Sequence, residues 1–224
     1  MSLLKKWADV NRVDSISNQL RSKRFRLFEE LCSSLPRPLT IIDIGGTVNF
    51  WAQRGWVGIN HVHITLVNQH QEQQDYDNIT SVIGDATNLH QFAHRSFDIA
   101  FSNSVIEHLF TFENQVAMGR EVQRVAKAYW IQTPNYWFPI EPHFHVPGWQ
   151  WMPIWLRVEI IRRYTCGWRG RTPDPVKALK VVSEVNLMTK RQLRRIFPTA
   201  SIVPEKFFGL NKSWIAYGGF PARR

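Results

Sequence analysis

The chain lacks the features of a secreted, disulfide-bonded or membrane-spanning protein. Its 224 residues include only two cysteines, Cys32 and Cys166, which are far apart and have no histidine or second cysteine at metal-ligand spacing. A disulfide framework and a zinc site are therefore not expected. No signal-peptide pattern and no apolar run of about 18 residues occurs, so we expect a protein of a reducing, cytoplasmic compartment.

Acidic residues are also scarce relative to basic ones. The chain has 18 Asp and Glu against 28 Lys and Arg, a formal net charge of +10. This excess indicates an anionic partner, such as a phosphorylated lipid, an anionic membrane surface or a nucleic acid. No internal repeat and no low-complexity tract is present, and the length suits one α/β domain with an insertion.

Four short apolar segments, each followed by small or polar residues, dominate the first half of the chain. The first, at residues 41–47, reads Ile-Ile-Asp-Ile-Gly-Gly-Thr, and the others lie at 63–68, 81–86 and 97–102. Parallel strands of this kind bind ligands along their carboxyl ends. The two glycines are adjacent, so this is not the Gly-x-Gly-x-x-Gly pattern of dinucleotide-binding proteins.

In this order the motifs resemble the class I S-adenosylmethionine-dependent methyltransferases, specifically the small type 11 group, over about residues 38–135. The resemblance implies an α/β fold: a Rossmann-like seven-stranded, mostly parallel sheet with helices on both faces and an antiparallel last strand. It also implies S-adenosylmethionine as the cofactor. The implied cofactor-binding residues are Asp43, Gly45, Gly46 and Thr47 at the amino-acid end, Asn68 and Gln69 at the ribose, Asp85 and Ala86 at the adenine, and Asn103 and Ser104 beneath the methionine portion.

Two positions depart from the family pattern. Asn68 stands where the family usually has an acid, and an amide lacks the charge assistance of a carboxylate in binding hydroxyl groups. The third glycine of the loop is missing. We expect Asn49 to replace it, because Asn tolerates left-handed backbone better than other non-glycine residues.

The rest of the chain divides into simple parts. A basic helix is expected over residues 15–33, capped by Asp14 and preceded by Lys5 and Lys6. A helix at 113–125 and a fifth strand at 128–132 follow the four strands, and a hairpin of 200–208 and 212–217 joined by 209–211 ends the chain. We therefore expect one domain with a helical cap (1–36), a cofactor-binding core (37–135), a substrate loop with a lid insertion (136–185), and a last helix with the terminal hairpin (186–224).

The segment after the fifth strand carries the candidate catalytic residues. Its three prolines favour an extended loop over 133–145, which would place His143 and His145 on one face near Glu141. Histidine is suited to take a hydroxyl proton near neutral pH, so His143 is the first candidate base, with His108 and His145 as alternatives. A role in bracing the loop stays open. No third ligand is evident, so no metal is expected.

The insertion is rich in tryptophan and arginine. Residues 151–161 carry a helical apolar stripe that includes Trp151 and Trp155, and Arg residues surround it. Such a helix suits the core of a lid, an interfacial anchor or the mouth of a pocket for a lipid-linked substrate. A nucleic-acid platform is disfavoured because the motifs of RNA modules are absent.

Together these features predict a methyltransferase that methylates a hydroxyl of a small-molecule, glycan or lipid-linked acceptor, with peripheral contact to anionic membrane. The alternatives are a non-catalytic S-adenosylmethionine- or ligand-binding protein of the same fold and a nucleic-acid methyltransferase. The sequence does not predict the oligomeric state.

Overall fold

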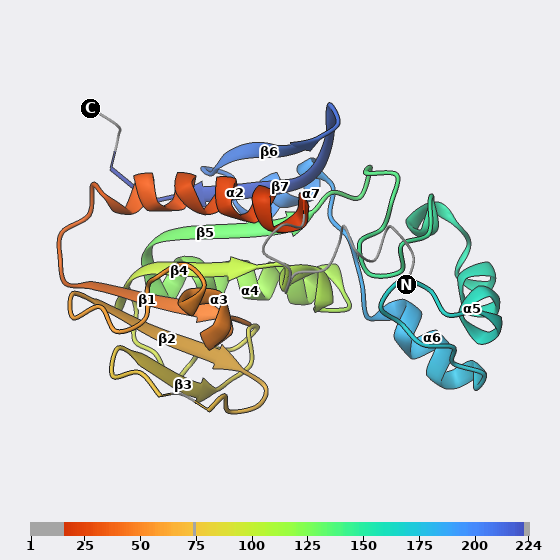
Figure 1. Ribbon diagram of the computed structural model, residues 1–224, viewed down its shortest axis with the longest axis horizontal. Helices are drawn as coiled ribbons and strands as arrows, with labels where there is room; N and C mark the ends of the chain where they lie inside the picture. Colours follow the sequence, from red (N-terminus) through yellow and green to blue (C-terminus); the bar gives the residue numbers. More distant parts are fainter. Residues whose placement is uncertain (1–15, 74, 222–224) are drawn as a thin grey trace.

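The computed structural model describes residues 16–73 and 75–221, which form a seven-stranded sheet of order β3-β2-β1-β4-β5-β7-β6 (Figure 1). Strands β1 to β5 are parallel neighbours, and β7 runs antiparallel to both β5 and β6. The predicted sheet with an antiparallel last strand is therefore confirmed. The strands are β1 (Leu39–Ile44), β2 (Val62–Asn68), β3 (Ile79–Ile83), β4 (Phe97–Asn103), β5 (Ala126–Pro134), β6 (Ser201–Phe207) and β7 (Leu210–Gly218).

Helices cover both faces of the sheet. On one face α2 (Ile16–Cys32) and α3 (Val48–Ala52) bury a cluster of aromatic residues, including Phe28 and Trp51, against β1, β2 and β4. On the other face α4 (Phe112–Val125) and α7 (Lys190–Ile196) pack on a separate, mainly aliphatic cluster. The predicted cap Asp14 and the basic residues Lys5 and Lys6 lie outside the described part of the chain.

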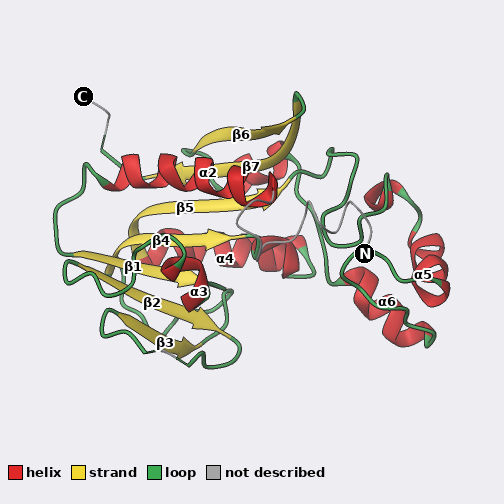
Figure 2. Cartoon of the chain, viewed as in Figure 1, coloured by secondary structure: helices red, strands yellow, loops and turns green. Residues whose placement is uncertain are grey.

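The segment between β5 and α7 forms a layer of its own. It contains the short 3-10 helix η2 (Trp149–Trp151) and the helices α5 (Ile154–Arg163) and α6 (Pro175–Ser183). Figure 2 shows it as helices and loops beyond the sheet. Phe144, Trp149 and Ile161 lie in its small buried core. Figure 1 shows this insertion on the side toward which β2, β4 and β5 point. None of the described helices combines the length and the apolar character needed to cross a bilayer.

Several element boundaries differ from the prediction. The third strand begins at Ile79 rather than at residue 81 and ends before Gly84. The terminal hairpin turns at Phe208 and Gly209, both with positive φ, so the loop is one residue earlier and shorter than expected. The predicted helix that begins at Trp151 is broken, because Pro153 starts α5 at Ile154. The short helices α3 and α6 were not predicted.

Candidate active site

The loop after β1 brings the backbone close to a carboxylate. Gly45 has φ +75° and its N–H donates to the carbonyl of Val67 over 2.8 Å. A Cβ at Gly45 would lie 2.4 Å from Val105, and one at Gly46 would lie 1.7 Å from Oδ2 of Asp43. Both positions therefore require glycine. Gly45 has a positive φ and lies close to Val105, and Gly46 leaves no room for a side chain because the Asp43 carboxylate lies against it.

Asp43 is a buried carboxylate with one satisfied oxygen. Its Oδ2 accepts a hydrogen bond of 2.7 Å from the indole N–H of Trp51. Its Oδ1 is buried without a hydrogen-bond partner among the described residues. Burial raises the pKa of Asp43 to about 7; the Trp51 bond opposes this rise and the charge of Glu72 adds to it. An unpaired buried oxygen of this kind favours a ligand that brings a donor or a positive charge.

A cavity of about 280 Å³ opens beside this carboxylate. Arg54 lies on one side, with its guanidinium 3.8 Å from the ring centroid of Phe50. The residues that line the cavity are Asp43, Gly45, Gly46, Thr47, Asn49, Phe50, Gln53, Arg54, Phe101 and Asn103. A buried carboxylate, aromatic rings and an arginine suit a ligand with an amino-acid group and a positive sulfur, because each charge of such a ligand meets an opposite charge or a ring face. The residues present therefore fit S-adenosylmethionine.

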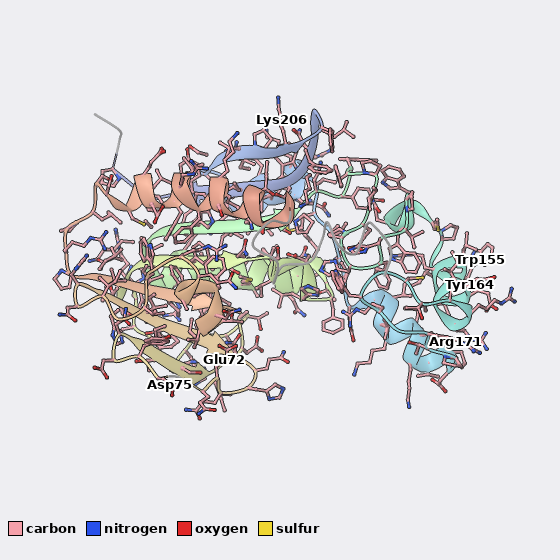
Figure 3. All side chains as sticks on the ribbon, viewed as in Figure 1. Glu72, Asp75, Trp155, Tyr164, Arg171 and Lys206 are labelled. Atoms are coloured by element: carbon pink, nitrogen blue, oxygen red, sulfur yellow. The ribbon has the colours of Figure 1, made fainter. Side chains whose placement is uncertain are left out.

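Glu72 contacts the glycine loop where it enters α3. Its Oε2 accepts a hydrogen bond of 2.9 Å from the backbone N–H of Val48, at the start of α3. Its own N–H donates to Oγ of Ser81 on β3 over 2.9 Å. Figure 3 shows Glu72 on the β2–β3 side of α3. This places a second carboxylate near Asp43, at the edge where β2 ends.

A second group of titratable residues lies where β4 leads into the 3-10 helix η1 (Ile106–His108). The rings of His108 and His143 meet edge to face with centroids 4.7 Å apart. Ligand atoms of Glu107, His108 and His143 all lie within 4.8 Å of one another. We call these three residues the Glu107 cluster. The structure thus joins η1 to the loop after β5 at one point.

Glu141 fixes the orientation of His143. One of its oxygens lies 2.5 Å from Nδ1 of His143, and the other accepts the backbone N–H groups of His143 and Phe144, each over 2.7 Å. Glu141 is buried. With Nδ1 held in this way, Nε2 is the ring nitrogen of His143 that can meet a ligand or substrate.

The surroundings shift the pKa values of the cluster in different directions. Burial raises the pKa of Glu107 to about 7. Burial, together with the neighbouring His143, lowers the pKa of His108 to about 4. Burial also opposes a charge on His143, but its hydrogen bond to Glu141 and the charges of Glu141 and Glu107 raise its pKa overall. Neighbouring groups whose pKa values are shifted in opposite directions are typical of functional sites.

A second cavity, of about 400 Å³, lies between the insertion and Phe110, in the loop before α4. Glu141, Tyr136, Gln150 and Arg157 line it together with apolar residues of the insertion. Two buried polar atoms in its wall, Oε1 of Gln150 and Nε of Arg157, have no hydrogen-bond partner among the described residues. Since Glu141 belongs to this wall and also holds His143, the cavity is adjacent to the Glu107 cluster.

The methyltransferase domain family matches residues 45–128, which run from the glycine loop through β4 and α4 to β5. The chain contains a class I methyltransferase domain. Two uncharacterized proteins of Mycobacterium tuberculosis are each 42% identical to it over 53 residues, which is 24% of this chain. That match spans only 18% of the length of those curated relatives.

Solved structures agree with the fold of the methyltransferase domain. A SAM-dependent methyltransferase from Aquifex aeolicus aligns over 92% of this chain and 93% of its own, with a TM-score of 0.51 and 13% identity. The CurJ carbon methyltransferase aligns over 91% of this chain and 55% of its own, with a TM-score of 0.57 and 12% identity. At these identities the likeness concerns the fold alone.

The cavity of the methyltransferase domain gathers some of the predicted cofactor residues and not others. Those in its lining are Asp43, Gly45, Gly46, Thr47, Asn49 and Asn103. Those outside it are Asn68, Gln69, Asp85, Ala86 and Ser104, at the ends of β2, β3 and β4. Both sets lie along the carboxyl edge of the sheet. The cofactor-binding roles of both sets stay predictions.

Three of the predicted residues outside the cavity lining make hydrogen bonds within the protein. The amide of Asn68 donates to the carbonyl of Gly46 over 2.8 Å, so it supports the glycine loop. Asp85 accepts from the N–H and hydroxyl of Thr87, each over 2.8 Å. Ser104 donates its hydroxyl to Gln132 over 2.8 Å.

Two conformational expectations were wrong. Asn49 does not have left-handed backbone: it lies inside α3, where the chain turns into a helix directly after Thr47 caps it. The loop at 133–145 is not extended with His143 and His145 on one face. A turn at residues 142–144 is closed by the His145 N–H and the Glu141 carbonyl over 2.9 Å, and the His145 ring lies 5.5 Å from that of Trp168.

Sequence reasoning also missed functional candidates. Glu107 was passed over although it precedes His108, because a buried glutamate is not distinguishable from a surface one in a short polar segment. The structure brings Glu107 and His108 to His143, so three possible ligand groups meet there, and His145 is not among them. Glu72 and Arg54 carry no motif, and their position beside the glycine loop depends on how α3 and the β2–β3 connection fold.

Proposed function

We propose that the protein transfers the methyl group of S-adenosylmethionine to a hydroxyl of an acceptor bound in the 400 Å³ cavity. One observation carries this proposal: η1 follows β4 within a few residues, so Asn103 lines the cofactor cavity while Glu107 and His108 belong to the cluster beside the acceptor cavity. Donor and acceptor would then meet at the end of β4. Proximity of this kind is the main source of rate in a bimolecular transfer.

Each part of the site has a distinct role in this proposal. When bound, S-adenosylmethionine supplies a methyl group on a positively charged sulfur. Asp43 and Arg54 hold the charged ends of the amino-acid portion. His143, oriented through Nδ1 by Glu141, takes the acceptor proton at Nε2. His108 and Glu107 orient the acceptor oxygen beside it, and the insertion excludes water.

The wall of the second cavity favours an acceptor with an anionic group. Arg157 contributes a partly buried guanidinium whose Nε has no protein partner among the described residues, and a phosphate or carboxylate would satisfy it. Acceptors of this kind include phosphorylated glycans and lipid-linked precursors. The neighbouring apolar residues Trp149, Ile154 and Val182 suit the apolar part of such a molecule.

The outer surface of the insertion supports an acceptor at a membrane. Trp137, Trp155 and Tyr164 expose 63%, 68% and 63% of their surface. Figure 3 shows Trp155, Tyr164 and Arg171 projecting from the end of the insertion farthest from the sheet. Exposed aromatic rings with arginines match an anionic lipid surface, where the rings insert at the headgroups and the guanidinium groups meet phosphates.

Calorimetric titration with S-adenosylmethionine and with S-adenosylhomocysteine is the first test. Saturable binding of both is expected, and its absence at millimolar cofactor would overturn the proposal. The second test is transfer of a labelled methyl group to extracted lipids, phosphorylated glycans and RNA in parallel. Binding without transfer to any of the three would favour a non-catalytic binding protein, and transfer to RNA would reassign the acceptor.

A further inference from the structure

The Glu107 cluster has the composition of a metal site. It offers two imidazole nitrogens and one carboxylate oxygen from two separate segments, η1 and the loop after β5. Two histidines and one carboxylate on one side of an open position are a common ligand set for divalent transition-metal ions. A tetrahedral ion with ligands at about 2.1 Å would hold them about 3.4 Å apart. The ligand atoms here all lie within 4.8 Å of one another, so each pair would have to approach by at most about 1.4 Å.

The carboxylate of Glu107 points to a ligand independently of the histidines. Glu107 is completely buried. Its Oε2 accepts the hydroxyl of Thr133 over 3.0 Å, while its Oε1 is buried without a partner among the described residues. A buried carboxylate oxygen left without a donor is costly, and a cation at this point would satisfy it.

Two of the three candidate ligands are also held by hydrogen bonds on their far side. Glu141 engages Nδ1 of His143 at 2.5 Å. The hydroxyl of Thr133 holds Glu107. Metal-bound histidines typically donate their second nitrogen to a carboxylate or a carbonyl in this way, which fixes the tautomer that exposes the other nitrogen.

The charges around the cluster favour a dication. Glu107 and Glu141 bring two carboxylates, both buried. Three arginines are also near: Arg169 is paired with Glu184 at 2.9 Å, Arg24 is paired with Glu205 at 3.4 Å, and Arg157 interacts with Glu141. Because two of these arginines are paired with acids of their own, the two buried carboxylates retain negative charge that a bound dication would meet.

We infer that Glu107, His108 and His143 bind a divalent transition-metal ion of the Zn²⁺, Mn²⁺ or Co²⁺ type, with Glu141 as the residue that positions His143. The binding does not depend on the proposed methyl transfer. Its catalytic consequence does rest on that function: the ion would bind the acceptor oxygen and lower the pKa of its hydroxyl, so that the proton leaves to water, and His143 would serve as a ligand in place of the base.

Cobalt binding to the untagged, chelator-treated full chain tests this inference. Titration with CoCl₂, followed by visible absorption, is expected to give one ion per chain with the spectrum of nitrogen and oxygen ligands. Glu107→Gln, His108→Ala and His143→Ala should each weaken binding by at least about tenfold, and Glu141→Gln by about ten- to hundredfold. His90→Ala, at an exposed histidine outside the cluster, is the matched control and should bind cobalt as the wild type does.

Two results would overturn the inference: no cobalt spectrum in the wild type, or equal affinity in the wild type, the three cluster variants and Glu141→Gln. Glu107→Gln keeps the buried shape, so one ligand variant remains informative if a histidine variant fails to fold. S-adenosylmethionine titration of the same samples separates the two proposals. Intact cofactor binding without cobalt binding removes the metal and leaves the methyltransferase, and cobalt binding without cofactor binding does the reverse.

Discussion

Trp51 and Asp43 form a buried hydrogen bond of 2.7 Å between the first helix after the glycine loop and the strand before it. The bond links the glycine loop to the core, because Asp43 lies against Gly46 and Trp51 lies in the aromatic cluster beneath α2. The position of the candidate cofactor carboxylate is thus tied to core packing. A substitution in the aromatic cluster should therefore change the position of the Asp43 carboxylate.

Trp51→Phe should distinguish the contribution of the hydrogen bond to stability from that of the ring packing. The ring still fills most of the space, but Oδ2 of Asp43 loses its donor inside the protein, which should cost about 1 to 3 kcal/mol of unfolding free energy. Urea unfolding measures this cost. Trp56→Phe is the matched control: its indole bonds Glu29 at 3.2 Å, but Glu29 is only partly buried, so water can replace the lost donor and the cost should be smaller. Equal costs would mean that the Asp43 bond has no special weight.

The raised pKa of Asp43 predicts a particular pH dependence of stability. In the unfolded chain its ordinary pKa is 3.8, and in the folded protein it is about 7. The folded state therefore holds the proton more tightly, so this contribution to stability is complete below about pH 4 and is lost as the pH rises through about 7. Relative to the wild type, Asp43→Asn should gain about 2 to 3 kcal/mol of unfolding free energy between about pH 5 and 8. Parallel pH profiles of the two proteins would contradict the burial argument.

Gly46→Ala should impair cofactor binding through a single methyl group. Its Cβ would lie 1.7 Å from Oδ2 of Asp43, so the carboxylate must move away. Loss of a charged hydrogen bond weakens affinity by about ten- to hundredfold, which titration calorimetry with S-adenosylmethionine would detect. Gly170→Ala, where an added Cβ meets nothing within 4 Å, should bind as the wild type does. Asp43→Ala should lose a similar amount; full affinity in both variants would move the cofactor elsewhere.

The sheet was predictable because each of its strands carries its own signal. Parallel strands buried on both faces need mostly apolar runs, and residues 41–44 and 97–101 are apolar apart from Asp43 and Asp98. The glycine loop was predictable for a similar local reason, since Gly45 needs positive φ and Gly46 needs the absence of a side chain. The antiparallel last pair followed from the turn residue Gly209.

The catalytic region was less predictable because its contacts join distant segments. Glu107 and Thr133 are 26 residues apart, and their hydrogen bond depends on β4 and β5 being neighbours. The turn that separates His143 from His145 depends on Glu141 accepting two backbone N–H groups, which no propensity of the proline-rich loop encodes. Burial of Glu107 is likewise a property of the assembled fold.

His143→Ala should reduce turnover strongly once an acceptor is known. A general base or a metal ligand at this position would each make kcat fall by about 10²- to 10⁴-fold, while S-adenosylmethionine affinity should stay near the wild-type value because His143 does not line the cofactor cavity. Glu141→Gln should show a smaller loss of kcat, since it removes only the orientation of the ring. His145→Ala is the control, because its ring contacts Trp168 outside the Glu107 cluster. Equal losses in all three variants would indicate collapse of the loop.

The exposed aromatic surface of the insertion should bind anionic vesicles. Trp151 and Trp155 expose 47% and 68% of their surface, so Trp151→Ala/Trp155→Ala should cost little folding stability but should weaken sedimentation with phosphatidylserine-containing vesicles. Arginines near an anionic surface contribute about 1 kcal/mol each, so the remaining binding should decrease with salt. Trp149→Phe, in the buried core of the insertion, is the contrasting variant: it should lower stability without a selective loss of lipid binding. If wild-type sedimentation equals that with neutral phosphatidylcholine vesicles, or if the double variant unfolds, these tryptophans serve the insertion itself and the net charge of +10 requires another anionic partner.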